Sequence, residues 1–332
     1  MWADVRKRLN ATRAELGAAA DRLYPDAPRV GSSALLARPG WVPDAPIPLE
    51  DVRLEWEPAP EPPAVVDPAE GLPPAFRTYA DAMAALAPPA VFEDRPAYRL
   101  VDADLRAARL RFGPASYFDG VNVGEAVAHE LAAGDGGGLP LRTRVGDPCD
   151  LTRRTALTAI TTVTIRNGRP ASYVLHWRDP GKVAHAGGLY QVMPVGVFQP
   201  LTDDVADLDL WRSMQREYSE EFLGADEVLD WRDVEFAALA GALDRHRAGG
   251  RLRAHVLGLG ADPLTFAVDL LAVVVLDPAV FDELFAGLVR ENAEGRVSTE
   301  PFGGTVPRPM QPAGAAALEL AWRHRDVLLS RG

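Results

Sequence analysis

The clearest hydrophobic pattern in the chain lies in residues 208–224. Apolar residues recur there every four positions, a spacing that gives a helix one apolar face: Leu210, Met214, Tyr218 and Phe222. Asp207 or Asp209 can cap the start of this helix, and Gly224 can end it. The pattern therefore predicts an amphipathic helix that packs on the body of the protein.

A dense strand signal precedes this helix. Residues 158–166 are rich in Thr, Val and Ile, and Asn167-Gly168 follows as a hairpin turn. Residues 171–177 form the predicted return strand, and residues 188–197 form a third strand that leads towards the helix. The order is strand, turn, strand, loop, strand and helix.

Helix and strand patterns also alternate after residue 224. We expect helices over residues 233–247, 278–290 and 313–329, and strands over residues 252–259 and 264–276. This alternation is typical of a mixed sheet covered by helices on both faces. The predicted fold class is α/β (α+β), with a mostly helical and extended region in front of it.

The first part of the chain has a different texture. Residues 2–23 predict one amphipathic helix, whereas the proline-rich residues 25–75 cannot form a regular helix or a central strand. That segment contains Trp41, Val52, Leu54 and Trp56, which disordered segments seldom carry, so we expect an extended arm that lies across the protein.

Helices follow at residues 76–86 and 120–131, the second capped by Asn122, with strands at 98–101 and 108–112 between them. The glycine-rich residues 134–148 predict a flexible connection. We place the domain boundary there, with an accessory region over 1–150 and the alternating domain over 151–332.

Composition limits the classes of function. The net charge of −12 argues against nucleic-acid or anionic-membrane binding, which needs a basic surface. The N-terminus has no apolar signal core, and the longest apolar run, near 266–276, is too short to cross a bilayer. Cys149 is the single cysteine, which fits a reducing cytoplasm without disulfides.

The predicted helix at 208–224 also carries the candidate chemistry. Glu217, Glu220 and Glu221 stand at i, i+3 and i+4 and so share a face. Carboxylates this close repel one another unless a cation lies between them, and Mg²⁺ prefers such oxygen ligands. The alternative is an ordinary solvated acidic face.

The string Arg216-Glu217-Tyr218-Ser219-Glu220-Glu221, with Gly224 after it, resembles the second half of the Nudix box. The resemblance covers about residues 155–300 and implies a Nudix-type α/β/α sandwich. It also implies that Glu217, Glu220 and Glu221 hold Mg²⁺ (or Mn²⁺) against a pyrophosphate, and that Arg216 orients the carboxylates. Arg216, Glu217 and Glu220 are then the expected catalytic residues.

Two features depart from the family pattern. Gly224 comes one residue late, and Leu208 stands where the first half of the box has a glutamate. Met193-Pro194-Val195-Gly196 resembles the family's Pro-Gly-Gly turn, but it lies too far upstream. We expect one aspartate of the lengthened loop to replace the glutamate, from the set Asp203, Asp204, Asp207 and Asp209.

Other candidates are placed by the same resemblance. The end of the second strand resembles the family's substrate-binding arginine position, so Trp177, Arg178 and Tyr190 are the expected substrate-binding residues, with His185 near them. Glu291, Glu294 and Glu300 are candidates for the catalytic base, and an exposed surface acid is the alternative for each. His129 beside Glu130 is read as a structural histidine, because the second histidine of a zinc motif is absent.

Two functions follow as hypotheses. The first is a cytoplasmic, Mg²⁺-dependent Nudix-type pyrophosphohydrolase that cleaves a phosphoanhydride in a nucleoside diphosphate-linked small molecule. The alternative is a Nudix-like domain that binds such a metabolite without cleaving it, as a sensor or protein-interaction module. A nucleotide-type small molecule is the expected partner in both, and a homodimer is left open.

Overall fold

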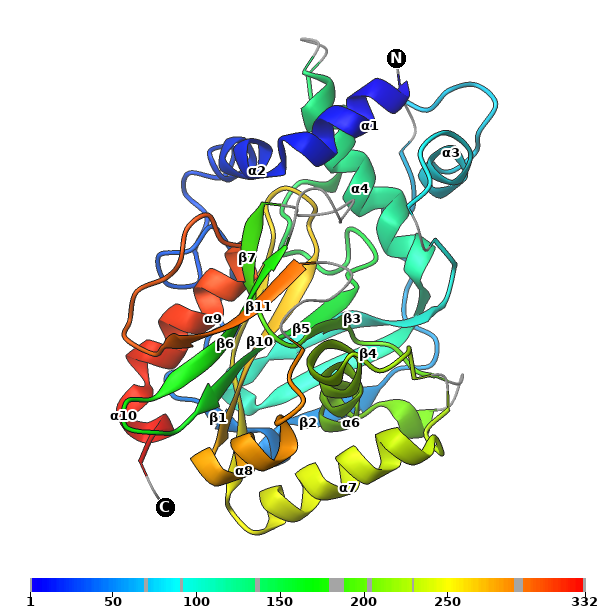
Figure 1. Cartoon of the computed structure of the whole chain (residues 1–332). Coiled ribbons are helices and arrows are strands. Elements are labelled where there is room, and N and C mark those ends of the chain that lie inside the picture. Colours follow the sequence, from blue (N-terminus) through cyan, green and yellow to red (C-terminus); the bar gives the residue numbers. More distant parts are fainter. Residues whose placement is uncertain are drawn as a thin grey trace.

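The computed structural model describes residues 2–68, 71–89, 92–134, 138–178, 188–201, 205–228, 230–289 and 295–330. Its centre is a large mixed sheet with helices on two sides, and a group of N-terminal helices covers one end of that sheet (Figure 1). His185, Glu291, Glu294, Asp203 and Asp204, named above as candidates, lie outside the described residues.

The helices are α1 Trp2–Ala11, α2 Arg13–Asp21, α3 Tyr79–Leu86, α4 Tyr117–Ala133, α5 Pro140–Val145, α6 Leu210–Glu217, α7 Val234–Ala248, α8 Pro278–Leu284, α9 Pro312–Arg323 and α10 Arg325–Leu328. The strands are β1 Ile47–Pro48, β2 Arg53–Trp56, β3 Pro96–Asp104, β4 Arg109–Ser116, β5 Thr158–Arg166, β6 Ser172–Arg178, β7 Leu189–Val192, β8 Val195–Val197, β9 Leu252–Ala261, β10 Val268–Leu276 and β11 Gly295–Pro301. Within the described ranges, no helix combines the length and the apolar character needed to cross a membrane.

The large sheet has the strand order β1-β9-β10-β5-β6-β11, with β7 paired to β6 and β8 paired to β5. The pair β10–β5 is parallel, while β9–β10 and β5–β6 are antiparallel hairpins. The sheet is therefore mixed, and the prediction of an α/β (α+β) chain with a mixed sheet is confirmed at that level.

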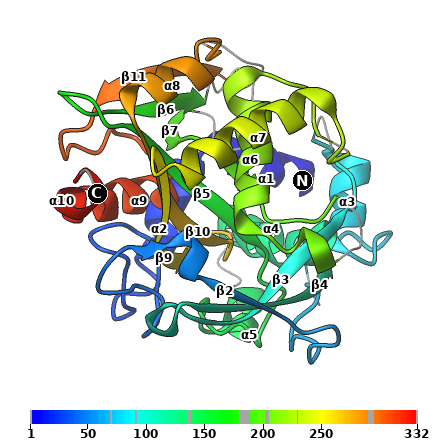
Figure 2. The same ribbon diagram turned by 90° about the horizontal axis from the view of Figure 1, so that it is seen from below.

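Helices cover both faces of this sheet. α6 and α9 lie on opposite sides of it in two perpendicular views (Figures 1 and 2). The central strand β10 explains why: every residue from Leu270 to Leu276 is buried, as expected for a strand without a solvated face. The two helices supply the apolar cover that such a strand requires.

A second, smaller sheet of order β2-β4-β3 joins the start of β5. Leu100 N–H of β3 donates to the carbonyl of Ala156 at 2.9 Å, and Tyr98 N–H donates to the carbonyl of Phe198 at 3.3 Å. These bonds attach the small sheet to the segments on either side of the β5–β8 pair. The N-terminal part of the chain therefore reaches the end of β8, close to α6.

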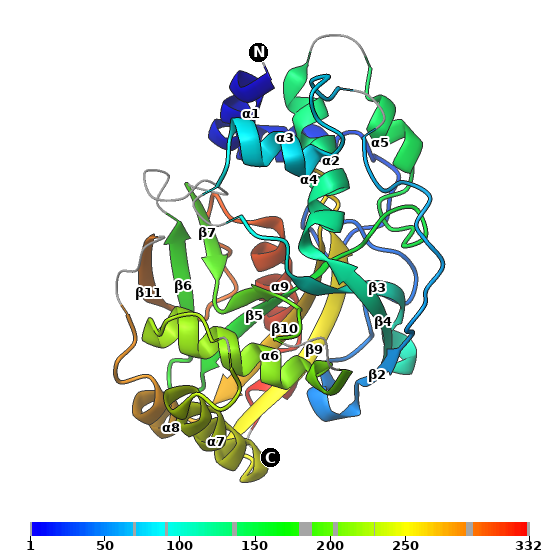
Figure 3. The same cartoon turned by 90° about the vertical axis from the view of Figure 1, so that its right-hand side faces the viewer.

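The N-terminal helices form a layer at one end of the large sheet (Figure 3). The single helix expected over 2–23 is instead two, because the chain turns at Thr12 between α1 and α2. The expected cap of the 120–131 helix is also different: Ser116 and Asp119 form a capping box for α4, while the Asn122 side chain accepts from Ala80 N–H at 2.9 Å.

The proline-rich segment lies across the body, as the sequence predicts. Trp41 is fully buried, and β1 pairs with the edge strand β9. One continuous apolar core contains residues from this arm, from the small sheet and from the large sheet. Packing therefore crosses the boundary drawn at residue 150, and the division into two domains stays a prediction.

His129 on α4 has a structural environment. Its Nδ1 lies 3.0 Å from Tyr79 Oη, and its ring stacks on Trp2 with the ring centres 4.6 Å apart. The pKa of His129 is lowered to about 4, mainly by burial and partly by the nearby Arg6 and Arg8, while Glu125 opposes the shift. The neutral imidazole is the form that this site holds.

This lowered pKa predicts an acid sensitivity. The unfolded chain takes up the His129 proton near pH 6.5, whereas the folded chain resists it until about pH 4, so this stabilisation is full above 6.5 and is lost as pH falls. We expect the unfolding free energy to fall by about 3 kcal/mol over that window. Urea unfolding at several pH values should show it, and His129→Gln should flatten the slope. An equal slope in wild type and variant would contradict this assignment.

Candidate functional site

The helix α6 begins where its sequence provides a cap. Asp209 Oδ1 accepts from Trp211 N–H at 2.8 Å and from Arg212 N–H at 3.1 Å. The expected apolar stripe is confirmed, since its four members are each no more than 3% exposed: Leu210, Met214, Tyr218 and Phe222. This buried stripe fixes which face of the helix remains for the glutamates.

The end of the helix is a π-helical turn over Tyr218–Phe222. A π-turn takes in one residue more than an α-turn, and such turns are frequent at functional sites. Gly224 then adopts a left-handed conformation with φ of +68°, which a glycine accepts without strain. The turn thus accommodates one additional residue between the glutamate pair and the glycine that ends the helix.

Tyr218 fixes this turn to the sheet. Its Oη lies 2.8 Å from Thr164 Oγ1 of β5, and that hydroxyl also donates to the carbonyl of Met193 at 2.8 Å. Both side chains are fully buried. The chain of bonds runs from the helix, through β5, to the turn that precedes β8.

Replacement of Tyr218 by Phe tests this attachment. Thr164 keeps its acceptor on Met193, so the variant loses only the tyrosine's hydrogen bond. We expect the unfolding free energy to fall by about 1 kcal/mol, the usual net value of one buried bond. Thermal or urea unfolding measures this change. No change in stability would contradict a stabilising hydrogen bond between the Tyr218 and Thr164 hydroxyl groups.

Arg216 lies beneath the acidic face. It is 2% exposed, and its Nη2 donates to Glu217 Oε1 at 3.0 Å and to the carbonyl of Val197 at 3.3 Å. Its Nε lies 3.9 Å from Glu220 Oε1. The arginine therefore contacts one glutamate, approaches a second and connects both to the end of β8.

Glu217 is held against strand β8. Its carboxylate packs on Gly196, where an added Cβ atom would overlap it. Burial raises the pKa of Glu217; the neighbouring Arg216 opposes this shift, and Glu227 adds to it. Gly196 thus leaves room for a carboxylate beside the strand, in a position where a free negative charge is costly.

Glu220 is the second glutamate of this face whose pKa is raised. Its Oε1 accepts from Val228 N–H at 2.9 Å. Burial raises the pKa of Glu220 to about 7, with a further contribution from the charge of Glu217. A carboxyl group with a pKa near 7 is only partly ionised at neutral pH, and a bound cation stabilises its ionised form. This position therefore favours a positively charged ligand.

Glu221 connects the π-turn to the upstream turn. Its Oε2 accepts from Val195 N–H at 3.0 Å. The turn Met193-Pro194-Val195-Gly196 is therefore in contact with two of the glutamates, although it lies far from them along the sequence. The third predicted ligand keeps one oxygen engaged with the backbone, and its role as a metal ligand stays a prediction.

Two charged residues that the sequence did not suggest belong to this site. Glu227 raises the pKa of both Glu217 and Glu220 and forms an ion pair with Arg95. Arg95 also bonds Glu93 at 2.8 Å. Arg95 lies 132 positions from Glu227, so no local pattern could have connected them.

The residues predicted to bind the substrate lie together on β6 and β7. Trp177 of β6 and Tyr190 of β7 are register partners with ring centres 4.7 Å apart, and Arg178 ends β6 beside them. In the part of the chain that the structure describes, neither aromatic residue has a hydrogen bond or ring contact with the glutamates. The substrate-binding role of the three residues stays a prediction.

Three acids have structural partners instead. Asp207 accepts from Trp231 Nε1 at 2.6 Å and is 5% exposed, while Asp209 caps α6, so both aspartates hold the helix start. Glu300 on β11 accepts from Ser298 Oγ at 2.8 Å. A replacement for the missing first-half glutamate is therefore not evident among the described loop residues.

Two of the carboxylates are suitable ligands for a magnesium ion. Among the described residues, no group of three or more His, Cys, Asp or Glu side chains is arranged to hold a metal ion. Mg²⁺ commonly binds through one or two carboxylates, with waters and substrate phosphates as the other ligands. Glu217 and Glu220, close in space and with raised pKa values, fit that arrangement.

Comparison with models of known protein families gives no match to this chain, and comparison with curated protein sequences gives none either.

Proposed function

We propose that the chain is a Mg²⁺-dependent, Nudix-type hydrolase that cleaves a phosphoanhydride in a nucleoside diphosphate-linked small molecule. The observation that supports it best is the contact of the glutamate helix with the turn at Val195 and Gly196, because that turn resembles the family's Pro-Gly-Gly turn and lies against the second half of the motif. The π-turn supports it further, since it accounts for the one-residue displacement of Gly224.

In this proposal Glu217 and Glu220 hold the metal ion, and Glu221 aligns the turn. A bound Mg²⁺ would supply positive charge that stabilises the oxygens of the pyrophosphate during water attack. Arg216 keeps the Glu217 carboxylate in place, and Glu220 would hold the cation in its deprotonated form, as a carboxylate. A nucleotide-type partner, Mg²⁺ or Mn²⁺ as cofactor and a cytoplasmic location all belong to the same proposal.

A panel of nucleoside diphosphate conjugates tests this function. Purified protein with Mg²⁺ should release a phosphorylated product from at least one member, over many turnovers. The same protein with EDTA should release none. Absence of turnover across the panel, in protein shown to bind Mg²⁺, would contradict hydrolysis.

A second candidate is a Nudix-like module that binds a metabolite without cleaving it. The observation that favours it is that the acids already have partners: Glu217 has Arg216, Glu220 has Val228 N–H, and Glu227 has Arg95. A site whose carboxylates keep these partners can bind a ligand without releasing a carboxylate to hold a metal ion for hydrolysis. Binding of a conjugate in one-to-one stoichiometry, with no product after long incubation, would select this candidate.

A further inference from the structure

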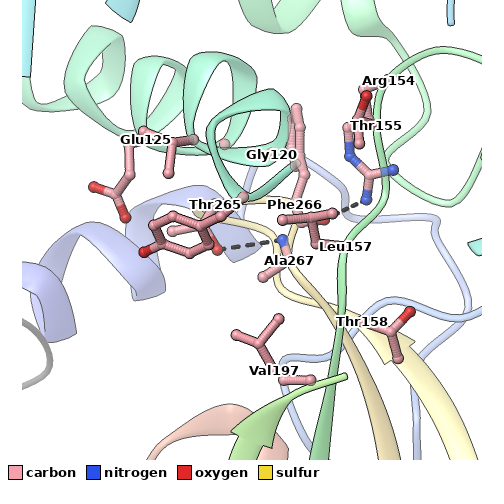
Figure 4. Close-up of a pocket in the computed structure, with 14 residues that line it drawn as sticks. Gly120, Glu125, Arg154, Thr155, Leu157, Thr158, Val197, Thr265, Phe266 and Ala267 are labelled. Carbon is pink, nitrogen blue, oxygen red and sulfur yellow. Dashed lines mark hydrogen bonds between the residues drawn. The ribbon is translucent and has the colours of Figure 1, made fainter. Parts of the chain in front are cut away.

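A cavity of about 170 Å³ lies between the N-terminal helix α4 and the large sheet. Its wall comes from α4, from the segment leading into β5, from the segment leading into β10, and from Val197 of β8 (Figure 4). The cavity is partly open to solvent. It is therefore built jointly by the N-terminal part of the chain and the sheet.

The cavity's shape depends on close packing by two glycines of α4. A Cβ atom at Gly124 would lie 2.8 Å from the carbonyl oxygen of Thr265, and one at Gly120 would lie 2.6 Å from the side chain of Leu157. The backbone contact requires glycine at position 124, whereas a side chain at position 120 would require the Leu157 side chain to move. α4 therefore touches the segments before β5 and β10 at these two glycines, and the cavity lies beside the contacts.

The wall is mostly apolar, and its single carboxylate is already paired. Glu125 bonds Arg6 and Arg13. Arg154 donates to the carbonyl of Phe266, and its Nη1 has no hydrogen-bond partner among the described residues. Figure 4 shows Glu125 and Arg154 on opposite sides of the group of lining residues. A cationic ligand would find no free carboxylate there, whereas a ligand without positive charge would replace water at apolar wall atoms.

The size of the cavity selects the ligand further. A cavity of about 150 Å³ in a protein interior accommodates benzene, so the present one holds a single ring. The rings of Tyr117 and Phe266 are part of its wall, and aromatic groups pack favourably against other aromatic rings. We propose that this cavity is a binding site for one aromatic ring that carries no positive charge.

Val197 connects this cavity to the glutamates. Its side chain lines the cavity, while its carbonyl accepts from Arg216 at 3.3 Å. Because neighbouring strand residues point to opposite faces, Gly196 faces Glu217 and Val197 faces the cavity, on the other side of β8. The ring is therefore either the distal end of a ligand that passes over the edge of β8, or a separate small molecule.

Phenol and benzene are suitable probes, detected by saturation-transfer NMR and titration. We expect the wild-type protein to bind them with a dissociation constant of about 1 mM or tighter. Ala159→Leu places extra carbon atoms in the cavity and should weaken binding at least about 10-fold. Leu157→Ala enlarges the cavity and should admit the two-ring probe indole. Ala115→Leu is the matched control, because it makes the same change on a half-buried strand position away from the cavity.

Absence of probe binding to wild type, or equal binding by folded Ala159→Leu, would overturn the proposal. If that variant does not fold, Val197→Leu fills the same space. A competition experiment then distinguishes the two sources of the ring. Displacement of phenol by Mg²⁺ with a uridine diphosphate conjugate, whose base is a single ring, identifies the cavity as part of the ligand site at the glutamates, and simultaneous binding identifies a separate molecule.

The glutamates are not part of the cavity, so Glu220→Gln should bind phenol as wild type does. A failure of metal binding or hydrolysis would therefore leave this result unchanged. Loss of phenol binding in Glu220→Gln would contradict the placement of the two sites on opposite sides of β8.

Discussion

Glu220→Gln should lower the Mg²⁺-dependent turnover number by about 10³-fold, the size of effect expected when a group that stabilises transition-state charge is removed. The glutamine keeps the shape of the side chain and can still accept from Val228 N–H. It also removes the like charge next to Glu217, which raises the pKa of Glu220 in the wild type. We therefore expect the unfolding free energy to stay equal or to rise slightly while turnover collapses.

Steady-state kinetics on the substrate found in the panel, together with urea unfolding, separates these two effects. Glu235→Gln on α7 is the matched control, since this exposed glutamate lies on the first turn of another helix. It should leave both quantities unchanged. A Glu220→Gln protein that turns over at the wild-type rate would remove this carboxylate from the mechanism.

Gly196→Ala should lower turnover by about 100-fold, because a displacement of about 1 Å in a catalytic group can cost that much. The added methyl group would occupy the position of the Glu217 carboxylate. The carboxylate must then move, together with its bond to Arg216. We expect a smaller loss of stability, about 1–3 kcal/mol, as in other overpacked sites.

Gly303→Ala is the control for this substitution. An added Cβ there meets nothing within 4 Å, so kinetics and stability should both match the wild type. Metal titration of Gly196→Ala should show weakened binding as well. An active Gly196→Ala enzyme with normal metal affinity would show that Glu217 is not required in its present position.

Local patterns predicted much of the fold, and their failures have physical causes. The strand at 158–166 and the helix at 233–247 were placed correctly, within a residue, since each carries a clear period and a turn or cap. The strand expected over 264–276 begins only at Val268. Asp262 Oδ1 accepts from two successive backbone N–H groups and thereby holds residues 262–267 in a turn.

The helix α5 and the strand β11 were not predicted, because their residue types are not typical of a helix and a strand. The glycine-rich connection at 134–148 contains the helix α5, which Glu130 holds by accepting from Leu141 N–H at 2.7 Å and Arg142 N–H at 3.0 Å. The polar strand β11 exists because it pairs with β6 along its length. Both elements depend on bonds to residues outside their own segment, which the periodicity of a single segment does not detect.

The candidate site shows the same division. The acidic helix, its buried stripe and the arginine beside Glu217 could be predicted from their spacing. The contact of Glu217 with Gly196 and the pairing of Glu227 with Arg95 depend on how distant segments come together. The cavity beside Val197 likewise arises from α4 and the sheet ends, three segments that no single stretch of sequence describes.

Isothermal titration of Mg²⁺ and Mn²⁺ tests the central claim most directly, with wild type and the Glu217/Glu220/Glu221→Gln triple variant, each with and without ADP-ribose. We expect a metal-dependent heat in wild type that the triple variant lacks, and we expect ADP-ribose to strengthen metal binding because phosphate oxygens complete the ligand set. Equal heats for wild type and variant would mean that these glutamates do not hold a metal ion, and that the function lies elsewhere in the molecule.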